Sequence, residues 1–168
     1  KQSVPDDAPL QMIYRVNSGA IPTDSWLHRP EEGGGMLIGE MVHFIDLMQH
    51  VSGEQPTSVF AHSMRLSTQT LAESDNVSIT VAFSEGSVGT LCYNTVGDDA
   101  ASKERLEVYG GGAVARLEDF RELETAKNGS TSSTSVWNQD KGQSEEMEAA
   151  VRAFRERGTA PIPFDELL

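Results

Sequence analysis

The chain has 168 residues, of which 38% are hydrophobic, 7% aromatic and 23% charged. This length suits one domain with a buried core, and the composition is typical of a globular protein, not of a disordered tail or a fibrous repeat. The 26 acidic and 13 basic residues give a formal charge of −13. This charge argues against a nucleic acid or an anionic membrane surface as partner, because both attract a cationic protein surface.

The chain carries few targeting or redox signals. Its N-terminal residues lack the apolar core of a signal peptide, and its apolar stretches are far shorter than the ~20 residues that span a bilayer. A single cysteine, Cys92, excludes an internal disulfide and a cysteine-based zinc site. We expect a cytoplasmic protein in which Cys92 is a small buried hydrophobic residue. The abrupt ends, without an initiator Met, lead us to expect a piece of a longer polypeptide.

The first third of the chain predicts a strand, a loop and a helix. Apolar and polar residues alternate over Leu10–Val16, which predicts a strand. The loop Ser18–Gly35 contains two prolines and ends in three glycines. Apolar residues at helical spacing then predict a helix over Met36–Val51, which Ser52 and Gly53 close.

The rest of the chain predicts a run of five or six strands joined by tight turns, and then a helix. A stretch of Ser, Thr, Gly and Asn, Lys127–Ser135, is predicted to be a loop. The helix is expected over Ser144–Arg157, with Ser144 as its N-cap and Gly158 beyond its end. The expected strands are Thr57–Leu66, Val77–Phe83, Val88–Thr95, Arg105–Tyr109, Val114–Leu117 and Arg121–Leu123.

This order of elements predicts the fold class α+β, with an open, mostly antiparallel sheet and helices packed on one face. We expect a single α+β domain over residues 1–168. Such a sheet leaves one face or edge in need of cover. We therefore expect a homo-oligomer that forms through the sheet.

The densest group of chemistry-bearing residues lies on the first predicted helix, where Glu40, His43, Asp46 and His50 share one stripe. In one interpretation, this stripe is the solvated face of an amphipathic helix. In another, His43 transfers protons near neutral pH, and Glu40 or Asp46 orients it. In a third, Glu40, His43 and His50 bind a metal ion, although the two histidines lie about two helical turns apart.

The loop before this helix offers further candidates. Asn17, Trp26 and His28 are polar or amphipathic, and the Trp26 ring suits stacking on a sugar-like ligand as well as covering the edge of a core. The glycines Gly33–Gly35 would let the backbone approach a ligand at the helix N-terminus, or would form a tight turn without one. No G-x-G-x-x-G follows a strand, so the chain shows no dinucleotide site of its own.

Several of these segments resemble a known family. The stretch Tyr14–Pro22, then Trp26, and the segment Gly33–Leu47 with its pattern Gly-Gly-Gly-x7-His-x-x-Asp-Leu are similar to the C-terminal domain of the Gfo/Idh/MocA oxidoreductases. These are NAD(P)-dependent sugar and cyclitol dehydrogenases and their relatives. The resemblance covers most of the chain from Leu10 onward and is weakest across Lys127–Asp140.

The resemblance implies a two-domain enzyme whose N-terminal Rossmann domain, absent from this chain, binds NAD or NADP. This lobe is then expected to be inactive alone, to cover the substrate and to form the oligomer interface. His43 matches the family's active-site histidine, which handles the proton of a substrate hydroxyl. The family's catalytic lysine comes from a Glu-Lys-Pro motif in the Rossmann half. Many members carry Asp four residues before the histidine, where this chain has Gly39 with Glu40 beside it.

We therefore expect the substrate-binding and oligomerisation domain of a dehydrogenase that oxidises a secondary hydroxyl of a sugar, nucleotide sugar or polyol. The expected catalytic residues are His43 and Glu40, with Glu40 orienting His43. One alternative is a non-catalytic binding or assembly module of the same fold, which Gly39 favours. Another is a small hydrolase or metal enzyme built on the helix stripe. The expected substrate-binding residues are Asn17, Trp26, His28 and Asp46.

Overall fold

The chain divides into two compact units, Lys1–Val136 and Trp137–Leu168. The first contains a sheet and helix α1 (Val42–Ser52), and the second contains helix α2 (Gln143–Glu156). No helix in the described parts of the chain has the length and apolar character that crossing a membrane requires. The structure, a computed structural model, describes residues 8–22, 24–29, 31–64, 75–156 and 158–162.

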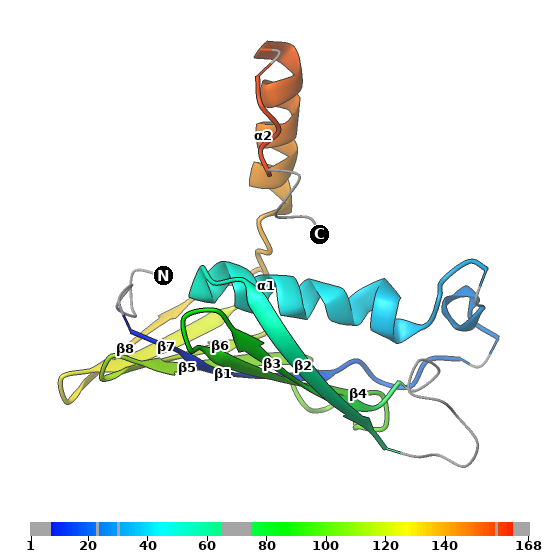
Figure 1. The fold of residues 1–168 in the computed structure, drawn as a ribbon, viewed down its shortest axis with the longest axis horizontal. Coiled ribbons are helices and arrows are strands. Elements are labelled where there is room, and N and C mark those ends of the chain that lie inside the picture. The colour runs from blue at the N-terminus through cyan, green and yellow to red at the C-terminus, as the bar shows by residue number, and fades with distance from the viewer. Residues whose placement is uncertain (1–7, 23, 30, 65–74, 157, 163–168) are drawn as a thin grey trace. The chain divides into compact units, whose positions relative to one another are not determined.

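The described strands form one open, eight-stranded sheet in the order β2-β3-β4-β1-β5-β6-β7-β8 (Figure 1). Neighbouring strands run antiparallel, except for β1 and β4, which run parallel. The expected α+β class with an open, mostly antiparallel sheet is confirmed. The elements of this unit besides α1 are β1 (Gln11–Asn17), the helical turns η1 (Trp26–His28) and η2 (Leu37–Met41), β2 (Pro56–Ser63), β3 (Val77–Phe83), β4 (Val88–Asn94), β5 (Glu104–Gly110), β6 (Ala113–Glu118), β7 (Glu122–Lys127) and β8 (Ser130–Ser135).

Strand β1 lies inside the sheet although it comes first in the chain. It pairs in parallel with β4, where Val16 faces Tyr93, and antiparallel with β5, where Tyr14 faces Leu106. A parallel pair needs a long crossover connection, and here that connection runs through α1, β2 and β3. As a result, the carboxyl ends of β1 and β4 and the beginning of β3 lie at the same edge of the sheet.

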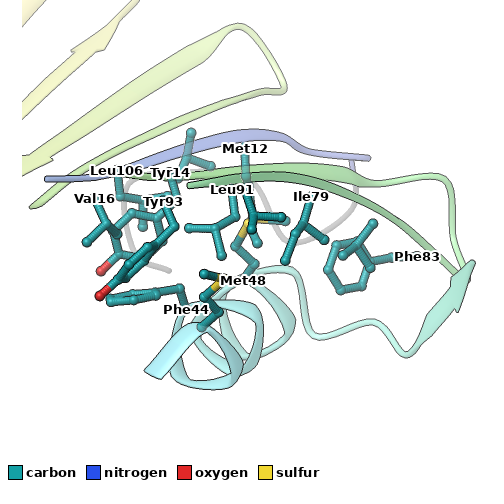
Figure 2. Packing of buried hydrophobic residues seen from close by; sticks show 14 of the residues in the cluster. Met12, Tyr14, Val16, Phe44, Met48, Ile79, Phe83, Leu91, Tyr93 and Leu106 are labelled. Carbon is teal, nitrogen blue, oxygen red and sulfur yellow. The ribbon is translucent and has the colours of Figure 1, made fainter. Parts of the chain in front are cut away.

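Helix α1 covers one face of the sheet, and the core lies between the two (Figure 2). Alternate residues of the central strands point to this face, as the two-residue period of a strand requires. Tyr14 of β1 and Leu91 and Tyr93 of β4 are at most 1% exposed. Phe44 and Met48 project toward these strands from the helix and are 8% and 0% exposed. Full burial of side chains of this size stabilises the fold by roughly 1.5–3 kcal/mol each.

The helix expected over Met36–Val51 is present, but its first turn is wider than an α-helix. Residues Leu37–Met41 form the π-helical turn η2, which leads directly into α1. The helix ends at Ser52, one residue beyond the predicted end at Val51. Gly53 ends it because its φ of 76° is left-handed and its N–H donates to the Gln49 carbonyl.

Two predictions for the later strands are wrong. The expected loop Lys127–Ser135 contains strand β8, and seven described strands follow α1 where five or six were expected. The Ser and Thr composition concealed β8, whose residues are all exposed. Asn128 and Gly129 have φ values of 52° and 75°, as in a two-residue hairpin turn. An Asn-Gly pair between two extended runs is the signal that would have found this hairpin.

The remaining differences concern the ends of elements. Helix α2 begins at Gln143, so Ser144 lies within its first turn and is not its N-cap. The predicted ends at Leu66 and Arg157 lie outside the described residues. Element ends depend on one or two hydrogen bonds, which a sequence pattern specifies poorly.

Candidate functional site

Polar side chains from five segments meet at the edge of the sheet where β1 and β4 end. Ser18 follows β1, Tyr93 lies near the end of β4, and Asp75 lies just before β3. Glu40 comes from η2 and His28 from η1. Hydrogen bonds or charge interactions link each of these residues to another of the five. We call them the carboxyl-edge cluster.

The closest contact in the carboxyl-edge cluster joins Tyr93 to Glu40. The Tyr93 phenol donates a hydrogen bond to Glu40 Oε2. Tyr93 is fully buried, whereas Glu40 is half-buried. Burial, and then the hydrogen bond to Glu40, raise the pKa of Tyr93 well above its ordinary value, although a hydrogen bond with Ser18 opposes this. The phenol therefore keeps its proton and remains a hydrogen-bond donor.

Glu40 thus contacts Tyr93, whereas the sequence predicted a contact with His43. No hydrogen bond or ion pair joins Glu40 to His43 among the contacts of the described residues. An uninterrupted α-helix turns about 100° per residue, but the π-helical turn η2 widens the turn that holds Glu40. This wider turn changes the angle between Glu40 and the α-helical residues after it. Glu40 also comes four residues before Phe44, which faces the sheet, and its side chain reaches Tyr93 of β4.

The other residues of the predicted helix stripe, His43, Asp46 and His50, are exposed along α1. None of the three makes a hydrogen bond or ion pair with another described residue. Glu40, His43 and His50 do not come together as a metal site, since the described residues contain no group of three side chains able to hold a metal ion. The His43 imidazole is therefore open to a ligand or to another domain.

The three glycines before the helix have a structural explanation. Gly34 and Gly35 adopt left-handed φ values of 68° and 83°. A Cβ atom on Gly33 would lie 2.5 Å from Leu27 Cα, so only glycine fits there. The Gly35 N–H also donates to the Leu27 carbonyl at 2.9 Å. These contacts fold the loop back on itself and bring η1 next to the start of the helix.

Two of the predicted substrate-binding residues, Trp26 and His28, lie on η1. His28 Nδ1 is 3.8 Å from Asp75 Oδ2, which is longer than a hydrogen bond. Burial raises the pKa of Asp75 above its ordinary value, and the nearby His28 offsets only part of that rise. The Trp26 side chain is 57% exposed. Both rings are therefore accessible near the carboxyl-edge cluster, and their role in substrate binding stays a prediction.

Asn17 lies at the end of β1 but on the opposite face of the sheet. Val16 faces the helix beside Tyr93, so the next residue points away. Asn17 Nδ2 donates to the Asp98 carbonyl at 2.9 Å, and the buried Oδ1 has no partner among the described residues. A Cβ atom on Gly97 would lie 1.9 Å from this Oδ1. The loop after β4 therefore packs directly on Asn17, whose role in substrate binding stays a prediction.

A second tyrosine–glutamate pair lies in the core on the same face of the sheet. The Tyr14 phenol donates to Glu104 Oε2 at 2.8 Å, and Glu104 is only 2% exposed. Phe44 of α1 contacts both tyrosines. Its ring centroid lies 5.0 Å from that of Tyr14 and 6.1 Å from that of Tyr93. Aromatic pairs at such distances add about 0.5–1.5 kcal/mol to the stability beyond the effect of burial. Phe44 therefore stabilises the packing of α1 on both β1 and β4.

The sheet face opposite α1 carries paired charges and a few exposed apolar side chains. Arg105 lies 2.7 Å from Glu107, and Ile13 and Phe60 are 39% and 72% exposed. Cys92 also lies on this face and is half-buried, less than the full burial expected from the sequence. Most of the basic side chains described on this face therefore have an acidic partner. The other ion pairs there are Arg15–Glu118, Arg105–Glu118 and Arg116–Glu124.

The second unit presents a different kind of surface. Met147, Val151 and Phe154 form an apolar stripe along α2 and are 66%, 42% and 87% exposed. A hollow of about 420 Å³ lies along the same helix, between Met147 and Glu156. No residue of α2 is buried. The stripe is thus an exposed apolar surface that the described part of this unit leaves uncovered.

Sequence analysis missed three residues of the carboxyl-edge cluster: Ser18, Asp75 and Tyr93. Tyr93 looks like one more inward-facing residue of an apolar strand. Only the parallel pairing of β1 with β4 and the turn η2 bring it beside Glu40. A usable signal exists, because a tyrosine at a buried strand position needs a hydrogen-bond partner for its hydroxyl. That rule predicts a partner but does not identify it.

The sequence matches one family profile. The profile of the GFO/IDH/MocA C-terminal domain matches residues 9–116. The matched range contains β1, α1 and the whole carboxyl-edge cluster, and it ends within β6. No curated protein sequence matches the chain.

Solved oxidoreductases share the fold. An oxidoreductase domain protein from Kribbella flavida is 14% identical with a TM-score of 0.75, and the alignment covers 99% of this chain and 54% of that one. The aldose-aldose oxidoreductase from Caulobacter crescentus, complexed with glycerol, is 14% identical with a TM-score of 0.74 and coverages of 94% and 49%. The UDP-N-acetylglucosamine 3-dehydrogenase from Acidithiobacillus ferrooxidans is 16% identical with a TM-score of 0.69 and coverages of 90% and 46%.

At this level of identity, the likeness to solved structures shows the fold and nothing finer. The chain spans about half the length of these relatives. The family profile, however, covers more than half of this chain. The chain therefore belongs to the Gfo/Idh/MocA family of oxidoreductases and corresponds to that family's C-terminal domain.

Proposed function

We propose that this chain is the substrate-binding and oligomerisation domain of a nicotinamide-dependent dehydrogenase. Its substrate would be a secondary hydroxyl of a sugar, nucleotide sugar or polyol. The observation that carries the proposal is the family match over residues 9–116, which includes the helix that bears His43. Two proteins of the same fold are named for UDP-N-acetylglucosamine and for aldoses, which supports a hydroxyl-rich substrate.

In the proposed reaction, the substrate carbon loses a hydride and its hydroxyl loses a proton, which leaves a ketone. His43 accepts the proton, because an imidazole exchanges protons near neutral pH and this one is exposed. A nicotinamide cofactor, when bound, supplies the hydride acceptor. Trp26, His28 and Asp46 are exposed or half-exposed and would contact the substrate.

We assign NAD or NADP mainly to a part of the polypeptide outside this chain. A dinucleotide site needs a glycine-rich turn that joins a strand directly to a helix. In this chain a long loop that contains η1 separates β1 from the helix, and Gly33 and Gly35 pack against Leu27. The residues of this chain therefore suit the substrate side of the reaction.

The test is His43→Asn in the complete polypeptide that carries this chain. Asparagine keeps a polar side chain of similar size but cannot take up the proton, so kcat should fall about 10²–10⁴-fold. The matched control is His50→Asn, since His50 is also exposed on α1 and should leave kcat unchanged. Steady-state rates of polyol or sugar oxidation with NAD and NADP provide the measurement. Undiminished turnover in the His43 variant would remove His43 from the mechanism.

The second candidate is a non-catalytic binding or assembly module, which Gly39 favours because many family members carry Asp at that position.

For both candidates we propose a homo-oligomer that forms through the sheet face opposite α1. The exposed Ile13 and Phe60 support a contact there, because the neighbouring charges already have partners within the chain. Light scattering of the purified protein should give at least twice the chain mass. An oligomer without any turnover would favour the second candidate, and a monomer would contradict this interface.

We also propose a cytoplasmic location. The lone free thiol of Cys92 supports it, because an oxidising compartment usually selects for paired cysteines.

A further inference from the structure

We propose that Tyr93 is a positioning residue of this site: it holds Glu40 so that the second carboxylate oxygen, Oε1, accepts a hydrogen bond from a ligand hydroxyl. The identity of that ligand rests on the proposed function. Tyr93 is itself fully buried and acts through Glu40.

Glu40 is held at one oxygen and open at the other. Oε2 accepts the hydrogen bond from the Tyr93 phenol, and Oε1 has no donor among the described residues. The side chain is half-buried, so it has lost part of its water shell. A ligand that donates a hydrogen bond to a carboxylate oxygen in that position therefore stabilises the complex.

The group that holds Glu40 is rigid. Tyr93 lies in the central strand β4, where it pairs with Val16 of β1. It shares a face with Leu91 and has no exposed surface. The Phe44 ring packs against it at 6.1 Å between centroids. Burial keeps the phenol protonated, as its raised pKa indicates. A donor on a strand restricts the position of its acceptor more than a donor on a loop could.

Glu54, just past the other end of α1, shows what a purely structural carboxylate looks like in this protein. Its Oε2 accepts from the N–H groups of Glu85 and Ser87, and its Oε1 accepts from the Ser87 hydroxyl. Both oxygens are occupied within the protein. Glu40 differs because one of its oxygens has no donor among the described residues. It also lies close to His43 in the chain, in the turn η2 that leads into α1.

The charge near Glu40 disfavours an anionic group as its ligand and is compatible with a neutral donor. Asp75 belongs to the same cluster and acts electrostatically on Tyr93, as Glu40 does. Two carboxylates repel a phosphate or a carboxylate ligand, whereas an O–H group donates to a carboxylate at about 2.5–2.7 Å. A hydroxyl of a sugar or polyol meets this requirement.

The test compares Tyr93→Phe with Tyr14→Phe in the complete polypeptide. Each variant removes one buried phenol oxygen that donates to a glutamate, and each keeps an aromatic ring against Phe44. Two quantities are measured for myo-inositol and for N-acetylglucosamine, which are uncharged, as probes. The first is binding without cofactor, by saturation-transfer NMR. The second is steady-state oxidation with NAD or NADP, resolved into kcat and KM.

We expect Tyr93→Phe to weaken binding and to raise KM by about tenfold, the effect of one misplaced hydrogen bond to a charged group, while kcat stays within about threefold. Tyr14→Phe should leave both constants unchanged. If binding weakens only in the Tyr93 variant but no protein turns the probes over, the dehydrogenase proposal fails and this inference stands. Equal behaviour of the two variants, or a wild-type protein that binds neither probe, overturns the inference.

Discussion

In the turn η2, which leads into α1, the Glu40 carboxylate receives one hydrogen bond, from the Tyr93 phenol. Just past the end of the same helix, the Glu54 carboxylate receives three, from the Glu85 and Ser87 N–H groups and from the Ser87 hydroxyl. Both carboxylates fasten the helix to the sheet. Both carboxylates are half-buried, and polar groups that lose water on folding are normally given hydrogen-bond partners by the protein. The fully satisfied Glu54 therefore has a structural explanation, and the open oxygen of Glu40 suits a ligand.

The surroundings of the two carboxylates differ in the same way. Ser87 is fully buried and also accepts a hydrogen bond from the Leu10 N–H at 2.8 Å, which makes a closed network next to Glu54. Near Glu40, His28 and Asp75 lie 3.8 Å apart, too far for a hydrogen bond. The start of the helix is therefore the open end, with polar groups that a ligand could still engage.

The largest expected effect tests the packing that supports the open end. Phe44→Ala removes the ring that contacts Tyr14 and Tyr93, and truncation of a buried Phe costs about 3–5 kcal/mol. Urea denaturation should show that loss in the free energy of unfolding. Phe154→Ala is the control, because Phe154 is 87% exposed and its truncation should cost less than about 0.5 kcal/mol. A small loss in both variants would contradict a core role for Phe44.

A smaller effect is expected at the closed end. Glu54→Gln replaces a charged acceptor of three hydrogen bonds at a half-buried position and should lower the free energy of unfolding by about 1 kcal/mol. Kinetic constants should not change. The control is Glu32→Gln, which breaks an exposed 3.0 Å ion pair with Arg29 and should cost less than about 0.5 kcal/mol. A kinetic defect in the Glu54 variant would erase the distinction between the two ends.

The smallest expected effect is the pH dependence of the stability that Glu54 contributes. Partial burial acts to raise the pKa of Glu54, but the hydrogen bonds from Ser87 and from the backbone outweigh it and lower the pKa below 4.5. A carboxylate with a lowered pKa stabilises the fold above its unfolded pKa, and this contribution is lost as the pH falls through the folded value. The stability difference between wild type and Glu54→Gln should therefore be constant above about pH 5 and shrink below about pH 4. A difference that stays constant into acid would contradict this.

Local patterns were sufficient for much of the fold and for part of the site. Alternation in Val77–Phe83 and the apolar stripe of α1 depend on neighbouring residues, so the sequence alone predicted these elements and the α+β class. The segment Gly33–Leu47 was likewise sufficient to indicate the family. Strand β8 was missed because its Ser and Thr residues carry no apolar alternation, and it forms by pairing with β7.

The arrangement of the site depended on contacts that no local pattern carries. Tyr93 and Glu40 are 53 positions apart, and they meet because β1 enters the sheet beside β4 and α1 crosses above them. The π-helical turn then changes the angle between Glu40 and His43, which an α-helical wheel cannot show. The sequence thus predicts which residues share a face of one helix or strand. Strand order, register and helix phase are settled only when distant segments pack, because the free energy that selects them comes from those long-range contacts.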